Sequence, residues 1–462
     1  MPKRTARIAP YVTAFAMVGS VLVAPLVAHG AARRSVQFPE DLAQPTINLS
    51  RNGDLGLSEA ERVVSAVEST GADAHIVRYG TVGMTRHMRA GRVLERTNGN
   101  WRVPLSTVAV PADYVRDLGG ADMARVMAAG QLILGRTSAQ LRDAQVGDII
   151  VLRDRRFRPH EFEVGAIVNE PFVAWNEVML SDVAARVLGG IEISSISVTD
   201  IVSYSKVVSA LNRNGFATGT TWRIRRSWDL QSPDGTLGLA STKKLLGEFA
   251  FKPAGGSAIR ISPEWLSANI EWKHRFTGIG LRFNCNKAII DDVQGALDEI
   301  VAEGLSRYID VRNSNRYGGC YVGRYNRLGG NFGSPSRHAW GMAIDINTVT
   351  NAQGATPQMN CAVVRIFRKW GFAWGGNFWW SDGMHFEWVG EPRDQLGYPL
   401  RYCRNLVDVP TTTLPVFGTT TTTTTTVAPS TTTSSSTTTT SSTSTTTVAP
   451  TTTTTLPITS NT

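Results

Sequence analysis

The sequence predicts an α+β fold in which a C-terminal domain, with a small antiparallel sheet flanked by helices, follows a mixed α/β accessory domain. Apolar residues recur at helical spacing over 289–301 and 360–370, whereas residues 342–347 and 384–389 alternate as strands do. Helices beside a small antiparallel sheet are typical of the α+β class. The length of 462 residues exceeds one ordinary core, which predicts a second folded domain upstream.

The accessory domain is expected over residues 35–260. Ser58 to Glu61 matches a capping box, which predicts a short helix from there to Gly71. Strands are expected at 74–79, 131–135, 148–152 and 162–168, and a helix at 181–188. The small and apolar residues of 134–180 resemble extracytoplasmic domains of ABC-type permeases. No nucleophile elbow, phosphate loop or metal cluster occurs in this half of the sequence, so we expect it to position the C-terminal domain or bind a partner.

The C-terminal domain is expected over residues 262–406. Its two helices end at Gly304 and Gly371, residues that commonly follow a helix. In the first strand Ile344 and Ile346 face one way and Asp345 the other, because side chains alternate along a strand. In the last strand His385 and Glu387 share one face.

The chain is basic, with a formal net charge of +9 and a sequence pI near 9.6. This charge favours anionic partners. No basic helix with interleaved aromatic residues occurs, so nucleic acid is not an expected partner, and anionic cell-wall polymers fit better. A basic surface that binds nothing is the alternative.

The first and last segments of the sequence differ in composition from the rest of the chain. Residues 1–32 place Lys3, Arg4 and Arg7 before an apolar run and small residues, as a signal peptide does, with cleavage expected after Gly30 or Ala32. An uncleaved membrane anchor is the alternative, and either would export the remaining chain. Residues 407–462 are dominated by Thr and Ser, which predicts a disordered tail: an O-glycosylated stalk or an unmodified one.

The 4 cysteines all lie between Cys285 and Cys403, and none forms a Cys-x-x-Cys pair. In an exported protein an even number indicates disulfides, with three possible connectivities. The pairs Cys285–Cys320 and Cys361–Cys403 are favoured because each joins neighbours in the sequence.

Three side chains of the C-terminal domain form a candidate metal site: His338, Asp345 and His385. Two imidazoles and one carboxylate with an open fourth position are typical of a hydrolytic zinc site. Ligands of this kind without a thiolate suit Zn²⁺ best. Gly341 gives the chain a place to bend, so that His338 can precede the strand that bears Asp345.

A zinc hydrolase also needs a general base. Asp382, three residues before His385, is the candidate, because Gly383 allows the turn to direct its carboxylate toward the site. Glu387 is the rival, or it could orient a ligand from behind. An Asp that only forms the turn before Gly383 is the other interpretation.

The combined pattern, Ser336-x-His338-x-x-Gly341-x-Ala343-x-Asp345 with Asp382-x-x-His385, resembles VanY-type D-alanyl-D-alanine carboxypeptidases and the related L-alanyl-D-glutamate peptidases. The resemblance covers residues 283–388. It implies that His338, Asp345 and His385 bind zinc and that Asp382 is the catalytic acid and base. It also implies that an upstream arginine steadies the substrate, for which Arg324 is the closest match among several arginines.

We therefore expect an exported zinc metallopeptidase, extracellular or associated with the cell wall, that hydrolyses amide bonds of peptidoglycan stem peptides. The D-Ala-D-Ala bond is the expected target. An endopeptidase cutting L-Ala-D-Glu or a cross-bridge is one alternative. A wall-binding module with a structural metal site is the other, and contact with a membrane is expected only if the N-terminal segment stays uncleaved.

Overall fold

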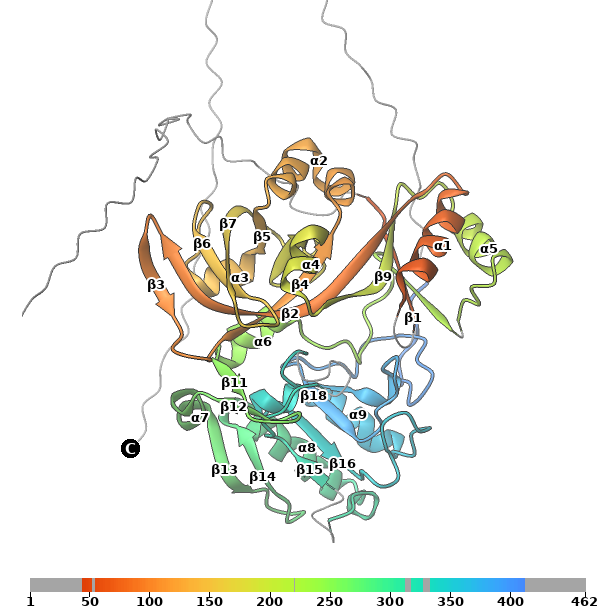
Figure 1. Ribbon diagram of the computed structural model, residues 1–462. Coiled ribbons are helices and arrows are strands. Elements are labelled where there is room, and N and C mark those ends of the chain that lie inside the picture. The colour runs from red at the N-terminus through yellow and green to blue at the C-terminus, as the bar shows by residue number, and fades with distance from the viewer. Residues whose placement is uncertain (1–43, 52–54, 220, 312–316, 327–332, 412–462) are drawn as a thin grey trace, which may run out of the picture. The chain divides into compact units, whose positions relative to one another are not determined.

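The computed structural model describes residues 44–51, 55–219, 221–311, 317–326 and 333–411 (Figure 1). The predicted signal segment (1–32) and nearly all of the predicted tail (407–462) lie outside these residues. Within the described ranges, no helix has the length and apolar character needed to cross a membrane.

The first half is built on a large mixed sheet. Its strands are β1 (Ile47–Arg51), β2 (Asp73–Arg89), β3 (Arg92–Arg96), β4 (Val103–Val110), β5 (Leu132–Gly135), β6 (Ile149–Arg153), β7 (Pro159–Val168), β8 (Val178–Ser181), β9 (Ile191–Thr199) and β10 (Trp222–Arg226). The order is β10-β1-β9-β2-β4-β8-β5-β7-β6, with β3 on β2. The long strand β2 also pairs with β6. The strands β2-β4-β8-β5-β7-β6 therefore form a closed barrel.

Four helices pack on this sheet: α1 (Leu57–Glu68), α2 (Ala112–Ala128), α3 (Arg136–Arg142) and α4 (Asp182–Leu188). A further helix, α5 (Tyr204–Arg213), packs against α1. The four strands predicted for this half are confirmed as parts of β2, β5, β6 and β7, and both predicted helices are confirmed as α1 and α4. The predicted capping box is wrong. Gly56 is the N-cap of α1, so Ser58 is already inside the helix and no side chain caps it.

The second half carries shorter elements. They are α6 (Leu239–Leu246), β11 (Phe251–Pro253), β12 (Ile259–Ile261), α7 (Pro263–Asn269), β13 (Ile270–Arg275), β14 (Arg282–Asn286), α8 (Ile290–Ala302), β15 (Tyr317–Gly319), β16 (Ala343–Ile346), α9 (Cys361–Lys369), β17 (Phe372–Trp374) and β18 (His385–Trp388). The 3₁₀ helices between them include η5 (Arg337–Trp340) and η6 (Gly375–Asn377). The predicted helices and strands are confirmed to within one residue at each end.

The strands β15-β16-β18-β17 form a small antiparallel sheet, with α8 and α9 beside it (Figure 1). The α+β class is thereby confirmed, as is the larger mixed domain that precedes the small sheet. The register sets Asp345 directly opposite His385 and Ala343 opposite Glu387. Directly opposed residues in antiparallel strands have their Cβ atoms about 5 Å apart on the same face. The sheet register alone therefore brings two of the three predicted metal ligands together.

One hydrophobic cluster surrounds the small sheet, and its buried residues run from Leu239 to Trp388. It thus includes Leu246, Phe249 and Phe251, which precede the predicted domain start at residue 262. The division at 260–262 stays a prediction. Residues that precede it nevertheless contribute to the hydrophobic core around the small sheet.

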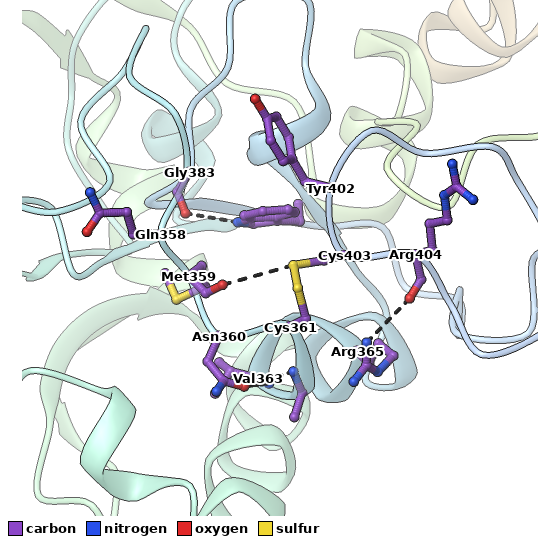
Figure 2. Close-up of a disulfide and its surroundings, with 12 residues drawn as sticks. Gln358, Met359, Asn360, Cys361, Val363, Arg365, Gly383, Tyr402, Cys403 and Arg404 are labelled. Atoms are coloured by element: carbon purple, nitrogen blue, oxygen red, sulfur yellow. Dashed lines mark hydrogen bonds between the residues drawn. A yellow bond between two sulfur atoms is a disulfide. The ribbon is translucent and has the colours of Figure 1, made fainter.

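Both favoured disulfides are confirmed: Cys285–Cys320 and Cys361–Cys403. Figure 2 shows the second, which ties the start of α9 to the segment after Tyr402. The side chain of Asn360 caps α9 by accepting hydrogen bonds from the backbone N–H groups of Ala362 and Val363. Disulfides persist in oxidising surroundings, so this pair is consistent with an extracellular protein.

Candidate metal centre

His338 lies on a tight turn that precedes strand β16. The turn is η5, and it ends at Gly341, which has a φ of +65°. A Cβ at this position would lie 2.8 Å from the backbone nitrogen of Asn286, so both the conformation and the space require glycine. The predicted bend at Gly341 is thus present, and β16 begins two residues later.

His338 is buried and held in one tautomer. Its Nδ1–H donates to the carbonyl of Cys320 over 2.9 Å, which leaves Nε2 as the nitrogen with a free lone pair. Nε2 is buried, has no hydrogen-bond partner among the described residues, and lies 3.3 Å from Asp345 Oδ2. A backbone carbonyl behind one ring nitrogen is the usual way in which a protein orients a histidine toward a metal.

His385 completes the group from the opposite strand. Its Nδ1 lies 3.0 Å from Asp345 Oδ1, and its Nε2 lies 3.6 Å from Glu387 Oε2. One donor atom each from His338, Asp345 and His385 fall within 4.8 Å of one another. The three predicted residues therefore come together as a set of donors for one cation, and the buried Nε2 of His338 fits a metal ligand.

The electrostatics of this cluster suit a positive charge. Burial raises the pKa of Asp345, but the electrostatic interaction with His338 and the hydrogen bond from His385 outweigh it and hold that pKa far below its ordinary value. Burial lowers the pKa of His385, whereas its hydrogen bonds to Asp345 and Glu387 raise it to about 10. Asp345 is thus a stable carboxylate that compensates positive charge in its surroundings.

Glu387 and Arg337 lie behind His385. Arg337 Nε is 3.2 Å from Glu387 Oε1, and its other nitrogens donate to Thr242 Oγ1 over 2.8 Å and to the carbonyl of Leu237. Glu387 is buried between this guanidinium and the imidazole of His385. This position favours the orienting role over the general-base role for Glu387. The sequence pattern alone did not single out Arg337, Thr242 or Leu237 for this contact.

Asp382 lies beside the metal ligands on the turn before β18. Its backbone carbonyl accepts from the N–H of His385, and its carboxylate accepts from Gln353 Nε2 over 3.2 Å. An ideal Cβ built on Gly375 would lie 3.2 Å from the Cβ of Asp382 and 3.1 Å from that of His385. The two side chains therefore both begin close to Gly375, so Asp382 and the candidate ligand His385 are near neighbours. The catalytic role of Asp382 stays a prediction.

Replacing Gly375 by Ala should disturb the site without changing any polar group. The new Cβ would meet the backbone oxygen of Asp382 at 2.5 Å, so the turn would have to move. A displacement of about 1 Å at a catalytic group can cost about 10²-fold in rate, and we expect a loss of that order in kcat/KM. Gly56→Ala, whose added Cβ meets nothing within 4 Å, is the control, and equal losses in both variants would contradict this assignment.

Arg324 lies next to the motif in space. Its backbone carbonyl accepts from the N–H of Ser336, two residues before His338, and its Nη1 donates to the carbonyl of Tyr325 over 3.4 Å. Its substrate-binding role remains a prediction. Phe378, which the sequence analysis did not single out, places its ring 6.0 Å from that of His385.

The donor set is one that hydrolytic zinc sites use, and comparison with known proteins supports a peptidase. Residues 330–388 match the family model described as D-alanyl-D-alanine carboxypeptidase, so this segment is similar to that family. The match contains all three metal-site residues and Asp382, and it confirms the predicted resemblance there.

The other comparisons add little to this assignment. No curated protein matches the chain. Among solved structures, the extracellular domain of the noncanonic ABC-type transporter YknZ from Gram-positive bacteria is similar with a TM-score of 0.26 and 12% identity, over 39% of this chain and 99% of that one. So low a score leaves the resemblance of residues 134–180 to permease domains a prediction.

Proposed function

We propose that the chain is an exported, zinc-dependent peptidase that removes the terminal D-alanine from peptidoglycan stem peptides. The observation that supports this most is the convergence of His338, Asp345 and His385 inside the segment that matches D-alanyl-D-alanine carboxypeptidases. Export is supported by the two disulfides.

Each candidate site residue has a separate role in this proposal. His338 Nε2, a carboxylate oxygen of Asp345 and His385 Nδ1 would hold Zn²⁺, which when bound supplies a Lewis acid for carbonyl polarisation and water activation. Asp382 would take the proton of the attacking water and pass it to the leaving amine. Arg324 would pair with the carboxylate of the substrate, for which a guanidinium is well suited.

Digestion of purified stem pentapeptides tests this proposal. The expected products are a tetrapeptide and free D-alanine, identified by mass. Cleavage between L-Ala and D-Glu, or of a cross-bridge, would instead establish the endopeptidase alternative. Treatment with a chelator should abolish turnover and added Zn²⁺ should restore it. Turnover that survives chelation, or no turnover with any stem peptide, would overturn the proposal.

Glu387→Gln should weaken zinc binding. Loss of the carboxylate behind His385 Nε2 removes the group that fixes the orientation of this ligand, and such changes cost about 10- to 100-fold in metal affinity. The measurement is zinc affinity in competition with a chelating dye, which does not depend on activity. Glu391→Gln, an exposed residue outside the site, is the matched control and should leave zinc affinity unchanged.

A further inference from the structure

A small pocket lies away from the metal ligands, between the middle of β2, the residue before β4, the end of β6 and the start of β11. It has a volume of about 40 Å³, and its lining includes Arg102, Arg153 and Phe157. A volume of this size holds roughly three waters, so it matches a single small polar group better than a sugar or a side chain.

Arg102 is fixed in this pocket by its neighbours. Its guanidinium lies over the rings of Phe157 and Phe251, at 5.1 and 4.8 Å from the two ring centres. One Nη–H donates to the hydroxyl of Tyr325 over 2.8 Å. Gly83 leaves the space for it, because a Cβ at this position would collide with the Arg102 side chain. Stacking of this kind orients a guanidinium while its edge stays available for hydrogen bonds.

Two of the arginines that line this pocket, Arg102 and Arg153, form no ion pair with a carboxylate of the described residues. Arg153 donates from Nη1 to the carbonyl of Phe157 over 2.7 Å, and its buried Nε has no hydrogen bond within the described part of the chain. Burial and the nearby charge of Arg153 lower the pKa of Arg102, although its contact with Tyr325 opposes this. Two half-buried guanidiniums that repel each other are a favourable place for an anion.

The other charged groups that line the pocket are already engaged. The carboxylate of Asp154 accepts hydrogen bonds from the Arg158 side chain, from His160 and from the backbone N–H groups of Arg156 and Arg158. Arg155 pairs with Glu192 over 2.7 Å. The carboxylate of Asp154 is thus held by these donors and forms no ion pair with Arg102 or Arg153, whereas Arg155 adds a positive charge whose partner is Glu192.

We propose that this pocket binds one oxyanion group, a phosphate or a carboxylate, through Arg102 and Arg153. Guanidinium groups bind both kinds of anion through paired N–H donors. The source would be the phosphate of an anionic polymer or the carboxylate of a peptide. This gives the large mixed sheet a binding role, and the proposal does not depend on the peptidase activity.

Calorimetric titration of the full chain tests the site, with inorganic phosphate, glycerol phosphate and acetate as separate probes. Saturable binding of at least one probe is expected, and Arg153→Gln and Arg102→Met should each weaken it about tenfold or more, since a hydrogen bond to a charged group contributes about 1.5–3 kcal/mol. Arg156→Gln, which removes the same charge from the same turn outside the pocket, is the control. Thermal melting checks that each variant is folded, and Arg153→Gln carries the test if Arg102→Met is not.

The outcomes separate the sources and the two sites. Binding of the phosphate probes alone indicates a phosphate-bearing polymer, and binding of acetate indicates a carboxylate; both support the proposal. Binding that persists in His385→Ala places the anion away from the metal centre. The proposal is overturned if no probe binds saturably, if Arg156→Gln weakens binding as much as Arg153→Gln, or if His385→Ala abolishes it.

Discussion

Asp382→Asn should lower kcat on a D-Ala-D-Ala-terminated stem peptide by about 10²- to 10⁴-fold, the usual contribution of a positioned general base. The amide keeps the size of the side chain but cannot take a proton from water. Because Asp382 is not among the three donors that converge, the variant should keep its bound zinc. The measurement is steady-state release of D-alanine together with the zinc content of the same sample.

Two further variants serve as controls for this experiment, one in a metal ligand and one outside the site. His385→Ala should lose both activity and zinc, because it removes a ligand. Asp408→Asn, at an exposed position of the C-terminal segment, should change neither. If Asp382→Asn retained full turnover, the proton-transfer role would pass to another residue. If it lost zinc, Asp382 would have to be assigned to metal binding instead.

The second large effect concerns stability. Arg368 of α9 is completely buried and pairs with Asp234 through Nε and Nη2, at 2.8 and 2.6 Å. Asp234 also accepts from the backbone N–H of Trp374 and from Asn377. Arg368→Met would leave this buried carboxylate without its countercharge, and breaking such a pair costs about 3–5 kcal/mol. The free energy of unfolding in urea, followed by tryptophan fluorescence, should fall by this amount.

The neighbouring residue gives a matched control. Lys369 also forms an ion pair, with Glu299 at 2.9 Å, but its side chain is half exposed. Exposed pairs contribute about 0–1 kcal/mol, so Lys369→Met should change stability little. Similar losses in both variants would show that removing a charge from α9, rather than uncovering Asp234, causes the effect.

The convergence of the three candidate metal ligands could be predicted from the sequence because it follows from local patterns. The alternation around Asp345 and His385 places both on one face of adjacent strands, and Gly341 marks the bend that brings His338 to them. No histidine other than His338 and His385 occurs after His274, which left few alternatives. The helices α8 and α9 were predictable for the same reason, since their apolar spacing is regular.

The supporting contacts could not be predicted in this way. Arg337 was one of several arginines near the motif, and its partners at Leu237 and Thr242 come from about 100 residues earlier. Asp234 stands in a stretch without regular periodicity, so nothing local indicates that it pairs with Arg368. The capping box failed for a related reason: such a pattern reports only local bonding, and α1 begins one residue before Ser58.

The long-range partners of Arg337 and Arg368 have a practical consequence for dissecting the chain. A fragment cut to begin at residue 262 would contain every candidate zinc ligand, yet it would discard Asp234, Leu237 and Thr242. Arg337 would then lose Thr242 and Leu237, and the buried Arg368 would lose its carboxylate partner. A minimal catalytic fragment should therefore start upstream of Asp234. The fragment that begins at residue 262 should express poorly even though it contains the whole motif.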